Sequence, residues 1–104
     1  GPLDLVICIN MIHISPWSAT VGLMQMTSER LRKGGFLYCY GPYKENGTAA
    51  PSNLNFDYSL KSRDPSWGVR DLEEVKALAA SRGLAFHERV EMPANNLSLI
   101  FRKD

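Results

Sequence analysis

The hydrophobic positions of this chain form two short, continuous apolar runs, and between them apolar residues recur at helical spacing. Residues 5–9 and 36–40 are uninterrupted runs with β-branched and aromatic side chains, which predicts strands covered on both faces of a sheet. Between them, a Ser-Pro pair favours a helix start, and Gly34 favours a helix end. We therefore predict a helix over 16–33 and two parallel strands joined by a right-handed crossover.

A long irregular stretch follows the second strand. Residues 42–69 are rich in Pro, Gly, Asn and Ser, and within them we predict a short helix near 52–62. Loops of this length in small domains usually serve a function or move, so we interpret 42–69 as an insertion that forms a lid. After it, Asp71 resembles a helix cap, and Gly83 closes the helix that the apolar spacing predicts.

The chain ends in two segments with strand-like alternation. Residues 84–92 alternate between two faces, which predicts a half-exposed edge strand. One face holds Phe86, Val90 and Met92, and the other holds His87, Arg89 and Glu91. A turn at 93–96 and a last strand at 97–102 complete an antiparallel hairpin. The predicted order is β-α-β-loop-α-β-β, an α/β fold in one domain over residues 3–104.

Composition limits the classes of protein to which the chain could belong. The 104 residues carry a formal net charge of +1, so no strong field attracts nucleic acid or an anionic membrane. No apolar stretch is long enough to span a bilayer. Cys8 and Cys39 lie inside apolar runs, which favours buried free thiols and a reducing, cytoplasmic location. The two histidines, His13 and His87, and the scattered carboxylates do not form a metal-ligand set.

Polar side chains follow both predicted parallel strands at the point where each strand ends. The first group lies at 10–15 and the second at 41–43. Ligands of open α/β sheets bind beyond the carboxyl ends of the parallel strands. If the two strands are neighbours, these loops therefore form one wall of a ligand cleft.

Four segments carry a resemblance to a known family. They read "CINMIHISPW", "YGPYKENG", "PSNLNFDYSLKSRDPSWGVRDLEEV" and "EMPANNLSLIFRKD". They resemble a methyltransferase-like family long labelled as a domain of unknown function, and the resemblance covers nearly all of residues 4–104. The element order is similar to the second half of class I S-adenosylmethionine-dependent methyltransferases. The resemblance implies the C-terminal half of a Rossmann-like methyltransferase fold, with sheet order 4-5-7-6, and S-adenosylmethionine as cofactor of the intact protein.

The sequence also departs from that family pattern. Such enzymes carry, before this point, a glycine-rich turn for the cofactor and an acidic residue for its ribose, and neither is here. The pair Gly34-Gly35 follows a helix and precedes a strand, the wrong order for a cofactor turn. The first strand would leave an apolar edge open, which favours aggregation. We therefore expect a fragment whose N-terminal half lies elsewhere, or a second copy paired on that edge. Alone, the chain should neither bind cofactor tightly nor turn over.

The resemblance places Asn10, Met11 and His13 beside the methyl donor. Each has an ordinary structural alternative. Asn10 could satisfy loop backbone groups, and Met11 could belong to the core. His13 is the candidate catalytic residue, because its unperturbed pKa lies near neutrality, but it could equally be a packed histidine bonded to the backbone.

The candidate acceptor-binding residues lie in the predicted lid and in the final turn. They are Tyr43, Asn53, Asp57, Trp67, Arg70 and Asn95. In the alternative, Trp67 and Arg70 anchor the loop, with Arg70 paired to Asp57 or Asp71. Turn chemistry alone would explain Asn95.

The resulting prediction is methyl transfer from S-adenosylmethionine to an acceptor that is either a small molecule or a protein. Methyl transfer asks the protein mainly to align the reactants and exclude water, so the lack of a catalytic dyad is neutral. The alternative is a non-catalytic interaction module that keeps a degenerate methyltransferase fold. A nicotinamide-dependent oxidoreductase fits the closing hairpin less well.

Overall fold

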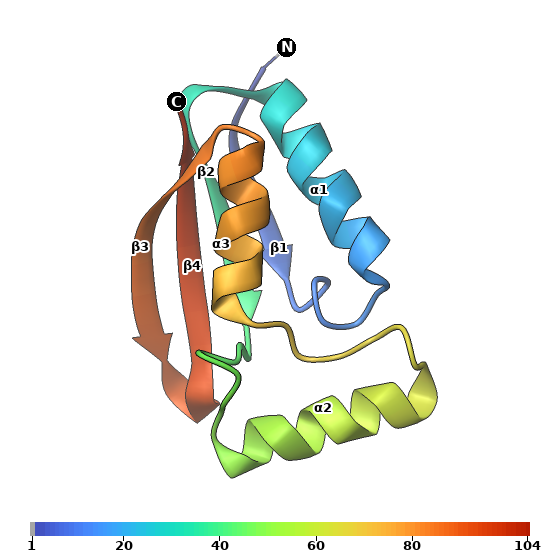
Figure 1. The fold of residues 1–104 in the computed structure, drawn as a ribbon. Helices are drawn as coiled ribbons and strands as arrows, with labels where there is room; N and C mark the ends of the chain where they lie inside the picture. The colour runs from blue at the N-terminus through green and yellow to red at the C-terminus, as the bar shows by residue number, and fades with distance from the viewer. Residues whose placement is uncertain (1) are drawn as a thin grey trace.

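The two apolar runs form neighbouring parallel strands in a computed structural model that describes residues 2–104. Strand β1 spans Leu3–Ile9, helix α1 spans Trp17–Arg30, and strand β2 spans Leu31–Gly41. The strands pair in parallel, with Cys8 opposite Cys39, and α1 crosses between them (Figure 1). The predicted β-α-β unit with parallel strands is confirmed.

The final hairpin extends the sheet beyond β2. Strand β4 (Asn96–Lys103) pairs antiparallel with β2 on one side and with β3 (Leu84–Met92) on the other. The sheet order is β1-β2-β4-β3, the predicted order in which the last strand lies inside and β3 forms the edge. A short 3-10 turn, η1 (Pro93–Asn95), joins the two strands, with Ala94 and Asn95 in the left-handed region.

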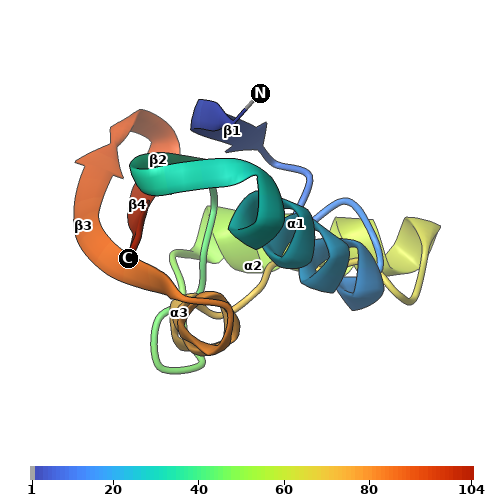
Figure 2. The same ribbon diagram turned by 90° about the horizontal axis from the view of Figure 1, so that it is seen from above.

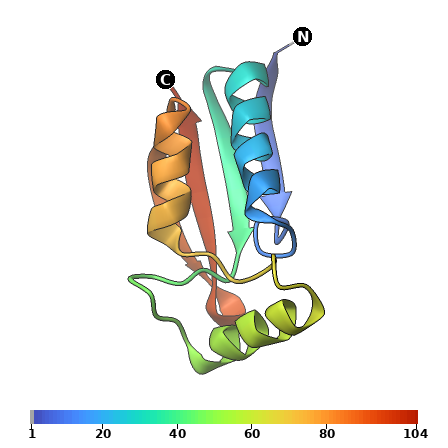
Figure 3. The same cartoon turned by 45° about the vertical axis from the view of Figure 1, so that its right-hand side comes forward.

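The helices lie on one face of the sheet and across one end. Helix α1 and helix α3 (Leu72–Ser81) cover one face, and helix α2 (Pro51–Arg63) crosses the end where β1 and β2 finish (Figures 1 and 3). Asp71 caps α3 by accepting the Glu73 N–H at 2.9 Å. Seen from above, no helix among residues 2–104 covers the opposite face of the sheet (Figure 2).

Burial along β1 follows this one-sided architecture. Cys8 points into the core and is 6% exposed, whereas its neighbours Ile7 and Ile9 are 59% and 63% exposed. Leu3 and Leu5 share the exposed face. The prediction that 5–9 is covered on both faces therefore holds for one face only within the described residues, where the outer edge of β1 has no strand beside it.

Helix α1 ends earlier than the sequence predicts. It ends at Arg30 rather than near residue 33, and the fully buried Leu31 already belongs to β2. Gly34 does not cap the helix. It has a φ of +78° inside β2, where the ladder to β1 is irregular, so it accommodates a bend that other residues rarely adopt.

A β-bulge at His87 changes which side chains of β3 lie on the core-facing side of the sheet. Phe86 lies opposite Phe101, but the next paired residue of β3 is Glu88, so His87 is an extra residue. From there on, Arg89 and Glu91 lie opposite Leu99 and Leu97, core-facing residues of β4. The prediction that Phe86 and Val90 share a face is therefore wrong.

Both cysteines are buried, free thiols on the core side of the sheet, as predicted. A hydrogen bond with Cys39 outweighs burial and lowers the pKa of Cys8 to about 7. No helix in the described part of the chain combines the length and apolar character that crossing a membrane requires.

Candidate functional site

The loops that follow β1 and β2 meet at the same end of the sheet. The Asn10 N–H donates to the Tyr40 carbonyl at 2.9 Å. A Cβ on Gly41 would lie 2.8 Å from His13 Nε2 and 3.0 Å from Asn10 Oδ1. Since real Cβ atoms essentially never approach so closely, only glycine allows this contact. The two loops thus form one wall, as their polar residues predicted.

Asn10 shapes the first loop through its backbone. Its φ of +61° lies in the left-handed region, which Asn tolerates better than most residues. Its carbonyl accepts the N–H groups of His13 at 3.1 Å and Ile14 at 3.2 Å. Met11 is half-buried and packs against the hydrophobic core, and the Ser15 hydroxyl donates to its carbonyl.

His13 is fully buried, and its protonation state follows from its partner. The Arg70 N–H donates to Nδ1 at 3.0 Å, so Nδ1 is unprotonated and Nε2 carries the proton. Burial, reinforced by the Arg70 charge, lowers the pKa of His13 to about 3. Nε2 has no partner within residues 2–104. The imidazole is therefore a neutral donor, and its one lone pair is already used, an arrangement unsuited to a general base.

Arg70 joins the first loop to the end of the lid segment. Its Nη2 donates to the carbonyls of Ser15 at 2.9 Å and Ser66 at 2.8 Å, and Nε donates to the Ile12 carbonyl at 3.3 Å. The guanidinium centre also lies 5.6 Å from the centroid of the Trp17 ring. The predicted ion pair with Asp57 or Asp71 is wrong, because the guanidinium binds carbonyl oxygens instead.

Asp57 holds the lid segment from α2. Its Oδ1 accepts the Val69 N–H at 2.8 Å, and its Oδ2 accepts Lys44 Nζ at 2.9 Å and Lys61 Nζ at 3.0 Å. Burial would raise its pKa, but the hydrogen bonds from both lysines and from the Val69 N–H prevail and lower it. A buried carboxylate with this many partners is a structural anchor.

Trp67 lies in the same segment, and its neighbour Gly68 donates to the His13 carbonyl at 2.9 Å. We call His13, Asp57, Arg70 and the backbone of 66–70 the anchoring network. It contains three of the predicted site residues besides Trp67, and most of their hydrogen bonds join segments that lie far apart in the sequence.

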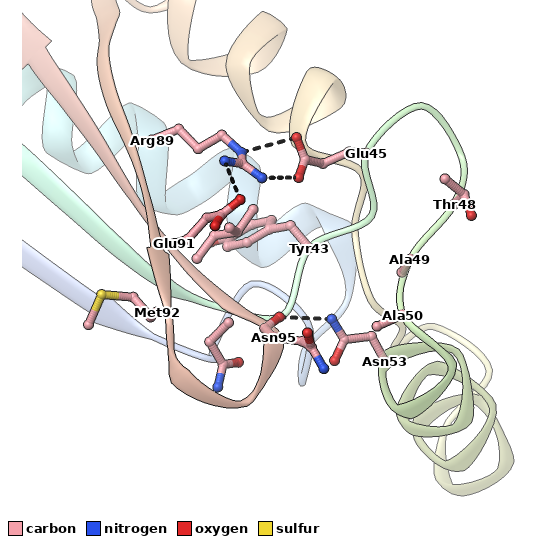
Figure 4. A pocket seen from close by; sticks show the side chains of 12 residues that line it. Tyr43, Glu45, Thr48, Ala49, Ala50, Asn53, Arg89, Glu91, Met92 and Asn95 are labelled. Carbon is pink, nitrogen blue, oxygen red and sulfur yellow. Dashed lines mark hydrogen bonds and ion pairs between the residues drawn. The ribbon is translucent and has the colours of Figure 1, made fainter.

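A cavity of about 350 Å³ lies beside Tyr43, between the 43–50 loop, the start of α2 and the β3–β4 hairpin (Figure 4). We call it the Tyr43 cavity. Three predicted acceptor residues line it, namely Tyr43, Asn53 and Asn95. The full lining is Tyr43, Glu45, Thr48, Ala49, Ala50, Asn53, Arg89, Glu91, Met92, Asn95, Asn96 and Leu97.

Charged side chains that sequence reasoning missed form one wall of this cavity. Arg89 binds Glu45 through Nη2 at 2.5 Å and Nε at 3.1 Å, and its Nη1 lies 3.4 Å from Glu91 (Figure 4). The alternation of β3 had assigned Arg89 and Glu91 to the solvent face. The bulge at His87 places them on the core-facing side of the sheet beside the cavity, where the Arg89 side chain is 34% exposed and the Glu91 side chain 80% exposed. The two-residue pattern gave no signal of this change of side.

One lining residue, Tyr43, carries a buried polar group without a partner among residues 2–104. Tyr43 is 4% exposed, and its hydroxyl makes no hydrogen bond within the part of the chain that the structure describes. Burial raises the pKa of this hydroxyl well above its usual value, so it stays protonated. On the opposite wall, Asn53 Nδ2 donates to the Asn95 carbonyl at 2.9 Å and ties α2 to the hairpin.

Residues 1–103 match the family model described as "Protein of unknown function (DUF938)". The chain belongs to the DUF938 family. The prediction from the local motifs that the chain belongs to a family labelled as of unknown function is confirmed. The model's description names no reaction.

Solved structures show which fold this DUF938 chain adopts. An O-methyltransferase family 2 protein from Planctomyces limnophilus, solved with apigenin, superposes with a TM-score of 0.89 at 18% identity, covering 100% of this chain and 32% of that one. CalO1, a methyltransferase of calicheamicin biosynthesis solved with SAH, gives 0.83 at 12% identity, covering 100% and 31%. A structure titled as a pericyclic reaction enzyme gives 0.84 at 13% identity, covering 99% and 27%.

These likenesses establish a Rossmann-like methyltransferase fold for the chain. At such identities they establish the fold alone, and one fold supports different reactions. The chain spans about a third of the length of the methyltransferase structures it matches.

Proposed function

We propose that the intact protein transfers a methyl group from S-adenosylmethionine to an acceptor held in the Tyr43 cavity, and that this chain forms the C-terminal half of its catalytic domain. The observation that carries the proposal is the contact of the 10–15 loop with Gly41. It lies at the carboxyl ends of two parallel strands, where α/β folds of this kind bind ligands.

The residues on this wall suit the cofactor. The lack of a Cβ at Gly41 leaves Asn10 Oδ1 and the His13 ring directly over the backbone. His13 Nε2 is a buried donor without a partner among the described residues, and Asn10 Oδ1 is an acceptor. Asn10, Met11 and His13 would hold the polar part of the cofactor. When bound, S-adenosylmethionine supplies a methyl group already activated by its sulfonium charge.

Tyr43 links the cofactor wall to the acceptor cavity. Its ring meets the His13 ring edge to face with centroids 4.6 Å apart, and it also lines the cavity. An acceptor in the cavity would therefore lie one side chain away from the 10–15 loop. The contribution of the protein would be positioning and exclusion of water rather than proton transfer by His13.

The same proposal includes a cover for the bare face of β1. Leu3, Leu5, Ile7 and Ile9 are all exposed there, and exposed apolar side chains that adjoin one another in this way often mark an interaction surface. An N-terminal half, or a second copy of the chain, would bury it. Light scattering on the 104-residue chain should then find self-association, and a stable monomer would contradict the proposed cover.

Calorimetric titration with S-adenosylhomocysteine tests the cofactor assignment. The full-length protein should bind it, whereas the 104-residue chain should show no measurable binding, because the proposal assigns half of the cleft to a part of the catalytic domain outside this chain. In the full-length protein, Gly41→Ala should weaken binding by about tenfold, since the added Cβ displaces Asn10 and His13.

Gly22→Ala is the matched control, because a Cβ at Gly22 meets nothing within 4 Å. It should leave the affinity unchanged. A full-length, folded protein with no affinity for S-adenosylhomocysteine would refute the methyltransferase proposal and favour a non-catalytic interaction module.

A further inference from the structure

We infer that Cys8 and Cys39 form a redox-sensitive pair of thiols, which a hydroperoxide converts reversibly to a disulfide bond between strands β1 and β2. The inference goes beyond the proposed function and does not depend on it. Neither cysteine is among the residues proposed above to hold the cofactor, and neither lines the Tyr43 cavity.

The first observation is the register of the two parallel strands. Cys8 of β1 is paired directly with Cys39 of β2, and both side chains lie in the core on the same face of the sheet. Neighbouring strands lie about 4.8 Å apart, within the range of about 4.4–6.8 Å that separates the Cα atoms of disulfide-bonded cysteines. The two side chains are joined by a hydrogen bond. A disulfide therefore needs a local adjustment and no rearrangement of the sheet.

The second observation is that the two thiols differ in exposure and in ionisation. Cys8 is 6% exposed near the end of β1, whereas Cys39 is fully buried. The hydrogen bond between them lowers the pKa of Cys8 to about 7, and the same bond, together with burial, raises the pKa of Cys39. Near neutral pH, Cys8 therefore supplies the thiolate, which is the form that reacts with peroxides, and Cys39 stays a thiol beside it.

These roles give a balanced reaction with hydrogen peroxide. The Cys8 thiolate attacks one oxygen, the O–O bond breaks, and hydroxide leaves as Cys8 becomes a sulfenic acid. The Cys39 sulfur then attacks the Cys8 sulfur, the S–O bond breaks, and the oxygen leaves as water with the Cys39 proton. In total, two thiols are oxidised to one disulfide, and one peroxide is reduced to two molecules of water.

The position of the pair between neighbouring strands favours a bond that is easily reversed. The Cβ atoms of a disulfide lie about 3.8 Å apart, closer than the usual spacing of strands, so this bond would be strained. Strained disulfides are readily reduced, and the disulfides of reducing compartments are usually of this transient kind. Two molecules of reduced glutathione would restore both thiols by exchange and leave as glutathione disulfide.

The pair also contacts the loop that follows β1. The backbone N–H groups of Met11 and Ile12 donate to the Cys8 sulfur, and these hydrogen bonds favour its thiolate. Oxidation removes the negative charge that strengthens them. The 10–15 loop should therefore loosen when the disulfide forms.

Peptide mapping of the full-length protein tests the inference. The protein is treated with hydrogen peroxide, its remaining thiols are blocked with iodoacetamide, and it is digested with trypsin without reduction. Cleavage after Arg30, Lys33 and Lys44 separates the two cysteines. We expect the peptide that ends at Arg30 to be linked to peptide 34–44, with a mass lower by two hydrogen atoms than that of the two peptides together. Reduced glutathione should abolish the link.

Two matched serine variants assign the order of the steps. Each is treated with peroxide and dimedone, a reagent that traps sulfenic acids. Cys39→Ser leaves Cys8 without a partner, so a dimedone adduct should accumulate at Cys8. Cys8→Ser leaves only the fully buried thiol, which should form no adduct.

Amide NMR signals of the protein without substitutions report on the loop. Peroxide should shift the signals of Met11 and Ile12, and glutathione should return them. Gly22 lies at an exposed position of α1, and its signal should stay unchanged. Unmoved Met11 and Ile12 signals in a linked protein would overturn the effect on the loop.

The inference is overturned if both cysteines still react with iodoacetamide after peroxide treatment, or if Cys8 is recovered as a sulfinic acid without a link to Cys39. A link that resists glutathione would overturn its reversibility. A dimedone adduct at Cys39 in Cys8→Ser would overturn the order of the two steps. The peptide map of the protein without substitutions decides the main point whether or not the variants fold.

Discussion

The anchoring network and the Tyr43 cavity lie on two sides of the same loop wall, and Asp57 and Arg70 of the network differ from Tyr43 in how their buried polar atoms are satisfied. In the network, the polar atoms of Asp57 and Arg70 form hydrogen bonds with backbone groups of other residues. In the cavity, the Tyr43 hydroxyl has no partner among residues 2–104. The comparison separates buried polar groups that hold the fold from one that is left without a partner, a distinction that residue type alone does not make.

The largest expected effect comes from breaking the network. Arg70→Ala removes the hydrogen bonds to three backbone carbonyls and should lower the free energy of unfolding by about 3 kcal/mol in chemical denaturation. Arg63→Ala is the control, because Arg63 is exposed and its hydrogen bond to the Ser59 hydroxyl is long, at 3.4 Å. Equal effects of the two substitutions would show that Arg70 is not an anchor.

The next effect is a pH dependence that belongs to His13. The pKa of His13 is about 3 in the folded protein, below the ordinary histidine value of 6.5. Between these pH values the unfolded chain binds more protons, so the free energy of unfolding falls as the pH falls. From pH 7.5 to 5 the loss should be about 2 kcal/mol.

Denaturation at several pH values checks this prediction. His13→Gln should be less stable at neutral pH but should lose the slope, whereas His87→Gln, at an exposed position, should retain it. An unchanged slope in His13→Gln would mean that other groups cause the acid sensitivity.

The smallest expected effect is that of a substitution at Tyr43, which lines the cavity. Unlike Arg70→Ala, it should raise the free energy of unfolding. Tyr43→Phe removes a buried hydroxyl that has no partner in the described part of the chain, so the free energy of unfolding should rise by about 1 kcal/mol. Tyr38→Phe makes the same change where the hydroxyl bonds to Ser98, and it should lower stability by about 1 kcal/mol. Thermal unfolding monitored by circular dichroism distinguishes the two. A destabilised Tyr43→Phe variant would show that the hydroxyl is satisfied within the fold.

The sequence predicted the framework well because continuous apolar runs and cap residues act locally. Residues 5–9 and 36–40 are parallel neighbours, and Asp71 begins a helix as its capping pattern indicates. The end of α1 was misplaced because Leu31 is buried whether it belongs to a helix or to a strand.

The candidate site was only half predictable. Residue type placed Tyr43 and Arg70 together in one lid, but Arg70 serves the loop backbone and only Tyr43 reaches the cavity. The wall formed by Arg89 and Glu91 was missed, since alternation in steps of two contains no information about a bulge.

That bulge has a consequence for how the charge of the cavity is encoded. Phe86 and Arg89 are three positions apart, an odd separation that a regular strand would send to opposite sides. The extra residue at His87 lets a single strand serve the core with one and the cavity wall with the other. If that residue were deleted, Phe86 and Arg89 would lie on opposite faces of β3. Either the Phe86 ring or the Arg89 side chain would then leave its present side of the sheet. The charge of the cavity wall therefore depends partly on whether β3 contains one extra residue. A comparison of the cavity-lining residues alone would not detect this dependence.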